Sequence, residues 1–522
     1  MSTKGTIADV ARNLLSGWVA IATKGGIALV MVPFLLNHLG TQAYGLICLL
    51  LVIVGLSTIA DFGLRAALIR ELSERVAKKD ADGFREISST ALALYLCIAV
   101  VVGAAGFVLA PWLVEVFKVG GDLRSIAIWL FRTYSVLALI VSLITPVFAA
   151  GLTSFMRFDV VEGVGAGSAI VSGLLLFALV PILPVSPLIT WAAITLFEMV
   201  LGTAVRYLFY RKCCFGGKLA LHHIKPARLK PLLSLGWKTY LLQMAHLMTN
   251  YANPLVLSGF LGTSAVALFK SASRVSEVLN PVVSILSFQL IPLTTRYHVQ
   301  GQNDTQCQLC LVGSRFTMLL GSLMVAGMFV FAEPFCRLWL SNSLGDDYLI
   351  VVHIMQMVAV VDFTTFARGT QFPVLLGMNR LGILMWVYIP TAIISLLLSI
   401  YLVGFTSLGI NGVLYPTIGL ALIRVPLITW HVSRLLGISL RRTLREAYAA
   451  PFACLVLTLL AAYGFSTAFV CHTWLTLCLA TGATTLVWSV LFILIGVTRD
   501  ERLIIGNFVS KWRAHLNRGR VA

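Results

Sequence analysis

Charged residues are scarce in this sequence of 522 residues. Asp, Glu, Lys and Arg together make up 11% of the chain, whereas hydrophobic residues make up 59%. A soluble globular domain contains about 25% charged residues. The composition therefore excludes a soluble fold and predicts an all-α polytopic membrane protein, for which the bilayer is the solvent.

Motifs for nucleotide, metal or catalytic chemistry are also missing. No G-x-x-x-x-G-K-[ST] sequence occurs, which excludes a P-loop ATPase. Cys307-x-x-Cys310 has no second pair, so we interpret it as two ordinary thiols. We expect no catalytic residues, no metal site and no cofactor. The first apolar run is too long for a signal peptide and lacks an A-x-A-like cleavage site, so it is expected to remain as an anchor.

Long apolar stretches fill most of the chain. A helix that spans a bilayer needs about 20 apolar residues, and strands of a membrane barrel are much shorter. We expect about fourteen transmembrane helices, at Leu14–Leu36, Tyr44–Leu68, Ser89–Ala110, Ile126–Ala150, Val160–Leu183, Leu188–Phe209, Leu235–Phe260, Ala265–Ile291, Phe316–Ala332, Tyr348–Phe372, Leu381–Val403, Ile410–Val432, Tyr448–Val470 and Trp474–Val497.

Basic residues outnumber acidic ones, 39 to 21, which gives a net charge of +18. If the N-terminus is cytoplasmic, about 27 of the Lys and Arg residues fall at cytoplasmic helix ends or loops, and only Lys118, Arg124 and Arg337 fall outside. The positive-inside rule thus explains most of the charge without a nucleic-acid partner. Both termini are predicted to be cytoplasmic, and the basic segment 210–234 is interpreted as a linker that contacts anionic lipid headgroups.

The sequence contains a weak internal repeat. LGTQAYGL begins at Leu39 and LGTSAVAL begins at Leu261, while Pro111 and Pro334 follow the third and ninth stretches at almost the same offset. Two six-helix halves in parallel register predict a pseudo-twofold axis along the membrane normal, with a site between the halves. The predicted domains are an N-terminal lobe at 1–209, the linker at 210–234, a C-terminal lobe at 235–432, and two appended helices with a basic tail at 433–522.

About nine cations and four acids fall inside the predicted helices. Each cation at the bilayer centre costs roughly 2.5–3.5 kcal/mol on insertion scales, so each needs an explanation. Arg206 and Lys238 lie near cytoplasmic helix ends, where they are expected to snorkel to the interface. Asp61 and Arg65 are four residues apart and can form an ion pair or a gate at the inner mouth.

The deeper cations are harder to explain by local pairing. Lys270, Arg274 and Glu277 share a helix face, so Glu277 can neutralise one of the two cations. Arginine donates paired hydrogen bonds to phosphate and lysine supplies a point charge. An anionic substrate is one interpretation, and structural pairing with Glu198 or Asp362 stays open as the other. The candidate diphosphate-binding cations are Lys24, Arg274, Arg424, Lys270, Arg132 and Arg368.

These residues lie within a recognisable set of motifs. The set consists of a proline in the first helix (Pro33), an L-G-x-x-x-Y-G turn from Leu39, an A-D-F-G-L segment from Ala60, FLGTSAVALFKSASRV from Phe260 and LLGMNRLG from Leu375. Taken together, the set resembles Wzx-type flippases for lipid-linked oligosaccharides, which belong to the MOP superfamily with MATE exporters and lipid II flippases. The resemblance covers nearly the whole chain.

The resemblance implies two six-helix lobes in a V-shaped, MATE-like arrangement plus two C-terminal helices. It implies alternating access, in which a sugar on undecaprenyl diphosphate moves from the cytoplasmic to the periplasmic leaflet of a bacterial inner membrane. The product would serve O-antigen, lipopolysaccharide, capsule or exopolysaccharide biosynthesis, with polymerase and chain-length proteins as partners. The resemblance leaves coupling to H⁺ or Na⁺ open, and the candidate gating or ion-coupling residues are Asp61, Arg65, Glu198, Glu277 and Asp362.

Three other functions remain open. A MATE-like exporter of organic cations is expected to have an acidic cavity, opposite in sign to this chain. A lipid II flippase has the same charge requirement and is not separated by it. A membrane glycosyltransferase or polymerase needs carboxylates outside the membrane, where Asp346–Asp347 is the only acidic pair predicted.

Overall fold

The computed structural model is helical throughout the residues it describes, which are 3–55, 57–121, 123–215, 219–220, 223–226, 240, 244, 247–248, 251–378, 380 and 382–497. Within these ranges, eleven helices are long and apolar enough to cross a membrane. The predicted all-α membrane fold is confirmed. Twelve of the 26 residues of the predicted helix at Leu235–Phe260, Lys238 among them, lie outside the described residues, as does the basic tail after residue 497.

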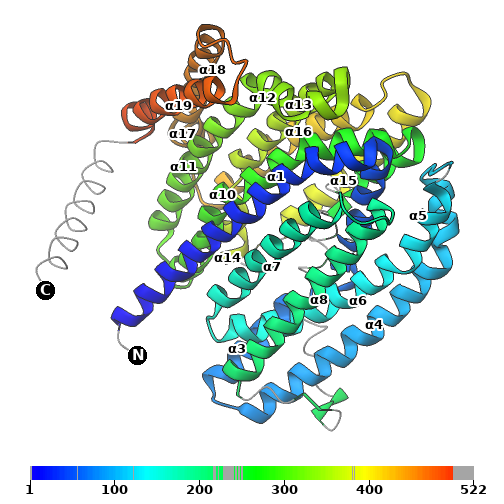
Figure 1. Cartoon of the computed structure of the whole chain (residues 1–522). Coiled ribbons are helices and arrows are strands. Elements are labelled where there is room, and N and C mark those ends of the chain that lie inside the picture. The colour runs from blue at the N-terminus through cyan, green and yellow to red at the C-terminus, as the bar shows by residue number, and fades with distance from the viewer. Residues whose placement is uncertain are drawn as a thin grey trace, which may run out of the picture. The chain divides into compact units, whose positions relative to one another are not determined.

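Most consecutive helices are joined by short connections, whereas the segment between α8 and α10 is described only in part (Figure 1). They are α1 (Thr3–Gly55), α2 (Ser57–Ala60), α3 (Leu64–Ala77), α4 (Ala81–Val116), α5 (Leu123–Arg132), α6 (Tyr134–Ser154), α7 (Phe158–Leu179), α8 (Pro187–Cys213), α10 (Thr263–Val299), α11 (Asn303–Val330), α12 (Ala332–Leu344), η3 (Gly345–Asp347), α13 (Tyr348–Ala367), α14 (Gln371–Gly377), α15 (Gly382–Phe405), α16 (Asn411–Leu435), α17 (Leu440–Thr443), η4 (Leu444–Ala449), α18 (Ala450–Ala468), α19 (Trp474–Leu491) and η5 (Phe492–Gly496).

Contacts between residues divide the chain into two compact units. The first unit contains 1–278, 340–354 and 384–420, and the second contains 279–339, 355–383 and 421–522. The division of the sequence into lobes at 1–209 and 235–432 stays a prediction.

In the first unit, α7 packs against α1 and α8, and α6 packs against α4 and α8 (Figure 1). Leu72, Phe84, Tyr95, Val147 and Tyr210 form part of one buried cluster contributed by α3, α4, α6 and α8. When lipid replaces water, association of helices depends on van der Waals packing and interhelical hydrogen bonds, and these closely packed side chains supply the first of these. This scaffold fixes the positions of the polar side chains described below.

Both copies of the repeated motif form a bend at glycine. α1 joins the first two predicted helices and is bent at Gly40, whose φ is 77°, while Gly262 has a φ of 86° immediately before α10. L-residues with side chains avoid this region, so glycine is required at both bends. The two motifs also contact each other, because a Cβ on Gly45 would lie 1.9 Å from the backbone oxygen of Thr263.

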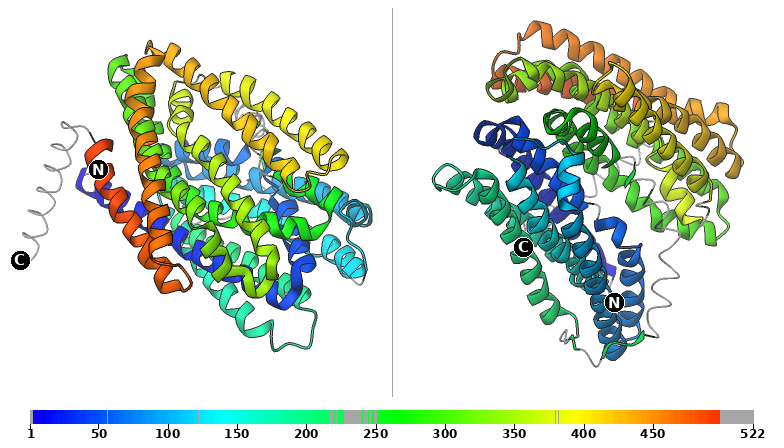
Figure 2. Two further views of the ribbon diagram at one scale, coloured as in Figure 1. Left: turned by 90° about the horizontal axis from the view of Figure 1, so that it is seen from above. Right: turned by 90° about the vertical axis from the view of Figure 1, so that its right-hand side faces the viewer.

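In the second unit, α18 packs against α11 and α19 packs against α18 (Figures 1 and 2). The indole Nε1 of Trp488 in α19 donates hydrogen bonds to the Leu319 carbonyl and the Ser322 hydroxyl of α11, both at 3.1 Å. The last two helices, which had no counterpart in the repeat, are therefore fixed to this unit by buried contacts.

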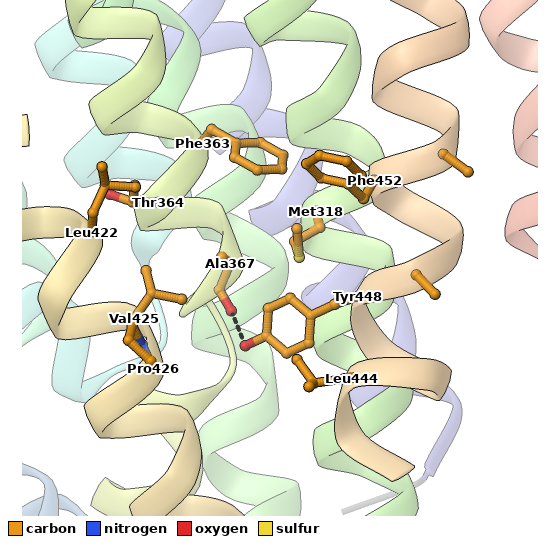
Figure 3. A pocket seen from close by; sticks show the side chains of 12 residues that line it. Met318, Phe363, Thr364, Ala367, Leu422, Val425, Pro426, Leu444, Tyr448 and Phe452 are labelled. Atoms are coloured by element: carbon orange, nitrogen blue, oxygen red, sulfur yellow. Dashed lines mark hydrogen bonds between the residues drawn. The ribbon is translucent and has the colours of Figure 1, made fainter. Parts of the chain in front are cut away.

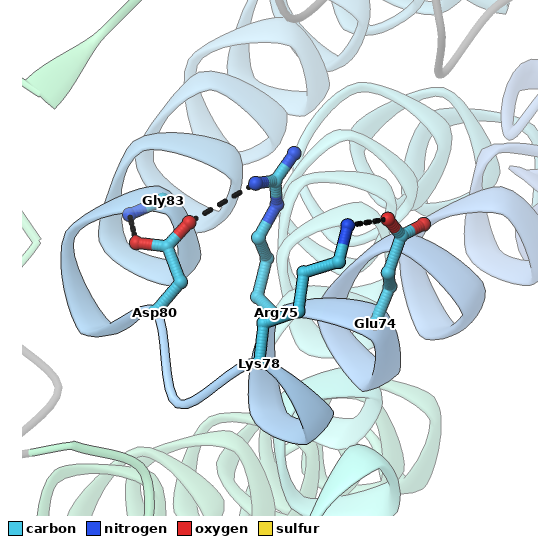
Figure 4. A network of polar contacts seen from close by, with 5 residues as sticks. All are labelled: Glu74, Arg75, Lys78, Asp80 and Gly83. Atoms are coloured by element: carbon cyan, nitrogen blue, oxygen red, sulfur yellow. Dashed lines mark hydrogen bonds and ion pairs between the residues drawn. The ribbon is translucent and has the colours of Figure 1, made fainter.

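A polar network connects α3 to α4 (Figure 4). The Asp80 carboxylate accepts hydrogen bonds from the Gly83 backbone N–H at 2.8 Å and from Arg75 Nη1 at 3.0 Å. It thereby caps the N-terminus of α4, whose first N–H groups lack partners within the helix. Beside it, a hydrogen bond from Lys78 lowers the pKa of the exposed Glu74 carboxyl.

Candidate functional site

A polar cavity of about 530 Å³ lies within the first unit. Three cations line it, namely Lys24 from α1, Arg65 from α3 and Arg206 from α8, together with one carboxylate, Glu198. Hydroxyl groups add hydrogen-bonding capacity to its wall, from Ser142, Thr145, Ser168 and Thr203. The sequence pointed to Lys24, Arg65 and Glu198 separately. The packing of α1, α3, α6, α7 and α8 places all three side chains around one cavity.

Lys24 forms an ion pair that the sequence did not indicate. Its Nζ lies 3.0 Å from Oε2 of Glu162 in α7, and both side chains are half-exposed, at 42% and 41%. Glu162 lies only two residues into a predicted span, where an acidic residue is ordinarily interfacial. The ion pair between Glu162 and Lys24 depends on the packing of α1 against α7, which the sequence alone does not reveal.

Arg206 also faces this cavity, although its position near a helix end had suggested snorkelling. Its Nη2 donates a hydrogen bond to the Val161 carbonyl at 3.3 Å, and its buried Nε has no hydrogen-bond partner among the described residues. Gly165 makes room for both cations, because a Cβ there would lie 2.8 Å from Lys24 Nζ and 3.1 Å from Arg206 Nη2. The two cationic groups therefore converge over one glycine.

Asp61 and Arg65 do not pair through their side chains among the contacts of the described residues. The Asp61 carboxylate accepts a hydrogen bond from the buried Tyr95 hydroxyl and a longer one, 3.4 Å, from the backbone N–H of Arg65. This arrangement leaves the Arg65 guanidinium to line the cavity. Asp61 is 8% exposed, so Tyr95 supplies the hydrogen bond that a buried carboxylate requires.

Lys270 and Arg274 share one carboxylate in α10. Lys270 Nζ lies 2.9 Å from Oε1 of Glu277, and Arg274 Nη1 lies 2.8 Å from Oε2. The sequence predicted that Glu277 neutralises one of the two cations, and the structure has it contact both. Tyr44 and Cys48 of α1 lie close enough to interact electrostatically with Arg274. The cluster carries one net positive charge.

The remaining candidate cations have different surroundings. Arg132, at the end of α5, places its guanidinium 5.0 Å from the centre of the Phe107 ring, a cation–π contact. In the second unit, Arg368 and Arg424 are buried, at 8% and 4% exposure, and Arg368 Nε donates to the Thr364 carbonyl at 3.1 Å. Asp362 accepts a hydrogen bond from Asn280 at 2.8 Å. These residues are not part of the polar cavity of the first unit.

An apolar pocket of similar size, about 530 Å³, lies within the second unit (Figure 3). Phe363, Met318 and Phe452 line it, and Tyr448 closes one side by donating a hydrogen bond to the Ala367 carbonyl at 2.8 Å. Its wall offers little for a charged ligand.

No group of three or more His, Cys, Asp or Glu side chains that could hold a metal ion occurs within the described part of the chain. Cys307 donates a hydrogen bond from its thiol to the Leu436 carbonyl at 3.2 Å. Outside the membrane helices, burial raises the pKa of Cys214 to about 12, which keeps this thiol protonated at neutral pH.

Solved structures of low sequence identity share this fold. An inward-closed structure of the lipid II flippase MurJ is 12% identical, has a TM-score of 0.68, and is matched over 91% of this chain and 98% of its own. An inward-facing multidrug resistance MATE family transporter of the MOP superfamily is 17% identical, with a TM-score of 0.66 and coverage of 83% and 99%. The outward-facing form of such a MATE transporter gives 16% identity, a TM-score of 0.57 and coverage of 83% and 97%. No curated protein sequence matches the chain.

The fold is therefore the one shared by the lipid II flippase MurJ and this MATE family transporter. Residues 10–298, more than half of the chain, match the family model described as polysaccharide biosynthesis protein. The chain belongs to this family. The resemblance drawn from the motifs at Pro33, Leu39 and Ala60 is confirmed, and so is the multi-pass membrane character of the chain.

Proposed function

We propose that the protein is a flippase that moves an oligosaccharide linked to undecaprenyl diphosphate from the cytoplasmic to the periplasmic leaflet by alternating access. The product supplies surface polysaccharide, which includes O-antigen of lipopolysaccharide, capsule or exopolysaccharide. The head group enters a basic, water-accessible space while the lipid tail stays in the bilayer.

One observation carries the proposal: cations gather in a cavity inside an apolar helical unit. Lys24, Arg65 and Arg206 line a space that also offers hydroxyl groups for a sugar. A diphosphate cannot enter hydrocarbon without neutralisation, so a carrier for it needs cations at depth. Lys270, Arg274, Arg132, Arg368 and Arg424 are proposed to contribute further positive charge along the path.

The alternatives differ from this proposal in charge or in substrate. A MATE-like exporter of organic cations is disfavoured because the lining of the polar cavity has three cations and one carboxylate. A lipid II flippase shares the fold and the requirement for cations. The family description, polysaccharide biosynthesis, favours an oligosaccharide over a peptidoglycan precursor. The same words could also describe an enzyme that builds the polysaccharide, but no motif of a glycosyltransferase or polymerase in this sequence supports that role.

The proposal includes the surroundings of the protein. The chain is placed in a bacterial inner membrane with both termini in the cytoplasm, and polymerase and chain-length proteins are its functional partners. Asp61, Arg65, Glu198, Glu277 and Asp362 are the proposed gating or ion-coupling residues, with H⁺ or Na⁺ as the coupled ion. Lobes at 1–209 and 235–432 would alternate between states, and the helices in 433–522 would not take part in the repeat.

Deletion of the gene tests the function directly. We expect lipid-linked oligosaccharide to accumulate in the cytoplasmic leaflet and surface polysaccharide to be lost, with both restored by the wild-type gene. If the lipid-linked oligosaccharide were distributed between the two leaflets as in the parent strain, the proposed flippase function would be refuted. Accumulation of peptide-bearing lipid II in the cytoplasmic leaflet instead would favour the lipid II alternative.

A further inference from the structure

Glu162 stands out because its ion pair with Lys24 connects two helices at the edge of the cationic cavity. The pair joins α1 to α7 at 3.0 Å, yet both side chains are about 40% exposed. An ion pair that is accessible to water contributes little to stability, because solvent screens it. A carboxylate placed in this way is free to exchange its cation for another one or for water.

The surroundings of the pair are more positive than one carboxylate can balance. Lys24 and Arg206 converge over Gly165, and Arg65 lies close enough to Arg206 to interact electrostatically with it. Among the described residues, Glu162 pairs with Lys24, Glu162 and Glu198 act on Arg206, and Asp61 lies beside Arg65. The cations also face a cavity of about 530 Å³, which is large enough for a phosphate group and part of a sugar.

We propose that Glu162 is an internal substitute anion, which holds Lys24 while the cavity is empty and is displaced from it when a phosphate of the lipid-linked ligand binds. This inference rests on the proposed function, since that function supplies the phosphate. Arg206 and Arg65 hold the ligand together with Lys24, and Arg206 is therefore a binding residue. When the ligand leaves, Glu162 returns to Lys24 and resets the site.

The exchange explains how a basic site can both accept and release an anion. A cation without a substitute would retain its phosphate tightly, and the return of Glu162 lowers the free energy of the empty state relative to the occupied one. Binding and release both matter to a transporter, because a site that holds its ligand too tightly slows the cycle. No covalent or redox step is involved.

The test is equilibrium binding of farnesyl diphosphate to the full-length protein in detergent, with farnesol as the uncharged control. Glu162→Gln removes the competing charge, so we expect binding about twofold to fivefold tighter than in the wild type. Lys24→Met is expected to weaken binding. In the double variant, removal of Glu162 should no longer tighten binding, because the contested cation is gone. Farnesol should bind all forms alike.

Glu198→Gln is the matched control, because it removes the carboxylate that lines the cavity and that has no ion pair to Lys24 among the described contacts. A smaller gain in affinity is expected for it than for Glu162→Gln. Equal gains in affinity for the two variants would mean that any lost negative charge near the cavity strengthens binding. That result would overturn the proposed exchange at Lys24. Unchanged or weaker binding in Glu162→Gln, or no binding of farnesyl diphosphate to either form, would overturn it as well.

The proposed function and this inference can fail separately. Normal leaflet distribution in the deletion strain would reject the flippase while leaving the exchange at Lys24 measurable in detergent. If the binding measurements contradict the exchange while the deletion strain shows a clear transport defect, the proposed flippase function stands. Glu162 then has a structural role only.

Discussion

Single charges inside an apolar bundle have different consequences according to their partners. Lys24 has a half-exposed partner, Lys270 and Arg274 share one carboxylate, and Arg132 contacts an aromatic ring. Among the described residues, the first of these arrangements borders the polar cavity of the first unit. The cations inside the helical bundle thus have three kinds of partner, and each predicts a different response to substitution.

Arg274 is expected to be needed for transport and not for folding. Arg274→Ala leaves Glu277 paired with Lys270, so no carboxylate is left without a cation. Loss of a charge-assisted hydrogen bond to a phosphate costs about 1.5–3 kcal/mol, which corresponds to about tenfold to a hundredfold lower transport. Surface polysaccharide and the amount of folded protein by size-exclusion chromatography are the measurements. Arg442→Ala, in an exposed pair with Glu446, serves as the control and should behave as wild type.

Gly165→Ala probes the convergence of Lys24 and Arg206. The new Cβ would lie within 3.1 Å of the ends of both side chains, which can move away. We expect normal amounts of folded protein but weaker binding of farnesyl diphosphate and lower transport. Gly163→Ala and Gly167→Ala in the same helix meet nothing within 4 Å and should leave binding unchanged. Equal binding in all three variants would contradict the geometry.

The apolar stretches of the sequence predicted the membrane helices well, because the length of an apolar stretch is a strong signal in a membrane protein. The turn at Leu39 and its repeat at Leu261 were also visible, and both contain a glycine with positive φ. The partners of the charges were not visible. Glu162 is 138 residues from Lys24, and Asp61 turns to Tyr95 and not to the nearby Arg65 side chain. Long-range packing decides such contacts, and sequence spacing carries no information about it.

The contact between the repeated motifs is expected to be intolerant of added volume. A Cβ on Gly45 would overlap the backbone of Thr263, which cannot move as a side-chain end can. Overpacking of this kind costs about 1–3 kcal/mol or more. Gly45→Ala should lower the unfolding temperature and the yield of folded protein. Gly26→Ala, in the same helix with open space around it, should not lower either.

The cap of α4 predicts a smaller loss of stability. Asp80→Ala removes the side-chain acceptor for the Gly83 N–H and for Arg75, and loss of a cap costs about 1 kcal/mol. A lower unfolding temperature in a fluorescence-based thermal assay is expected, with transport retained. Glu74→Ala disrupts only an exposed pair in the same network and should leave the unfolding temperature unchanged (Figure 4).

For the molecule as a whole, the distribution of charge determines orientation. With about 27 of 39 basic residues on one side, both termini should face the cytoplasm. A fluorescent protein fused after Ala522 should therefore fluoresce, and alkaline phosphatase fused there should be inactive. Alkaline phosphatase inserted after Asp347, in a predicted outer loop, should be active. An active phosphatase at the C-terminus would reverse the predicted orientation.

The two copies of the repeated motif are not interchangeable. Gly45 of the first copy lies against the Thr263 backbone, where a methyl group has no room. The equivalent position of the second copy is Ala267, which carries that methyl group and is fully buried. A chain in which the first copy took the sequence of the second would therefore lose the close approach, so the similarity between the halves stops at the residue that joins them.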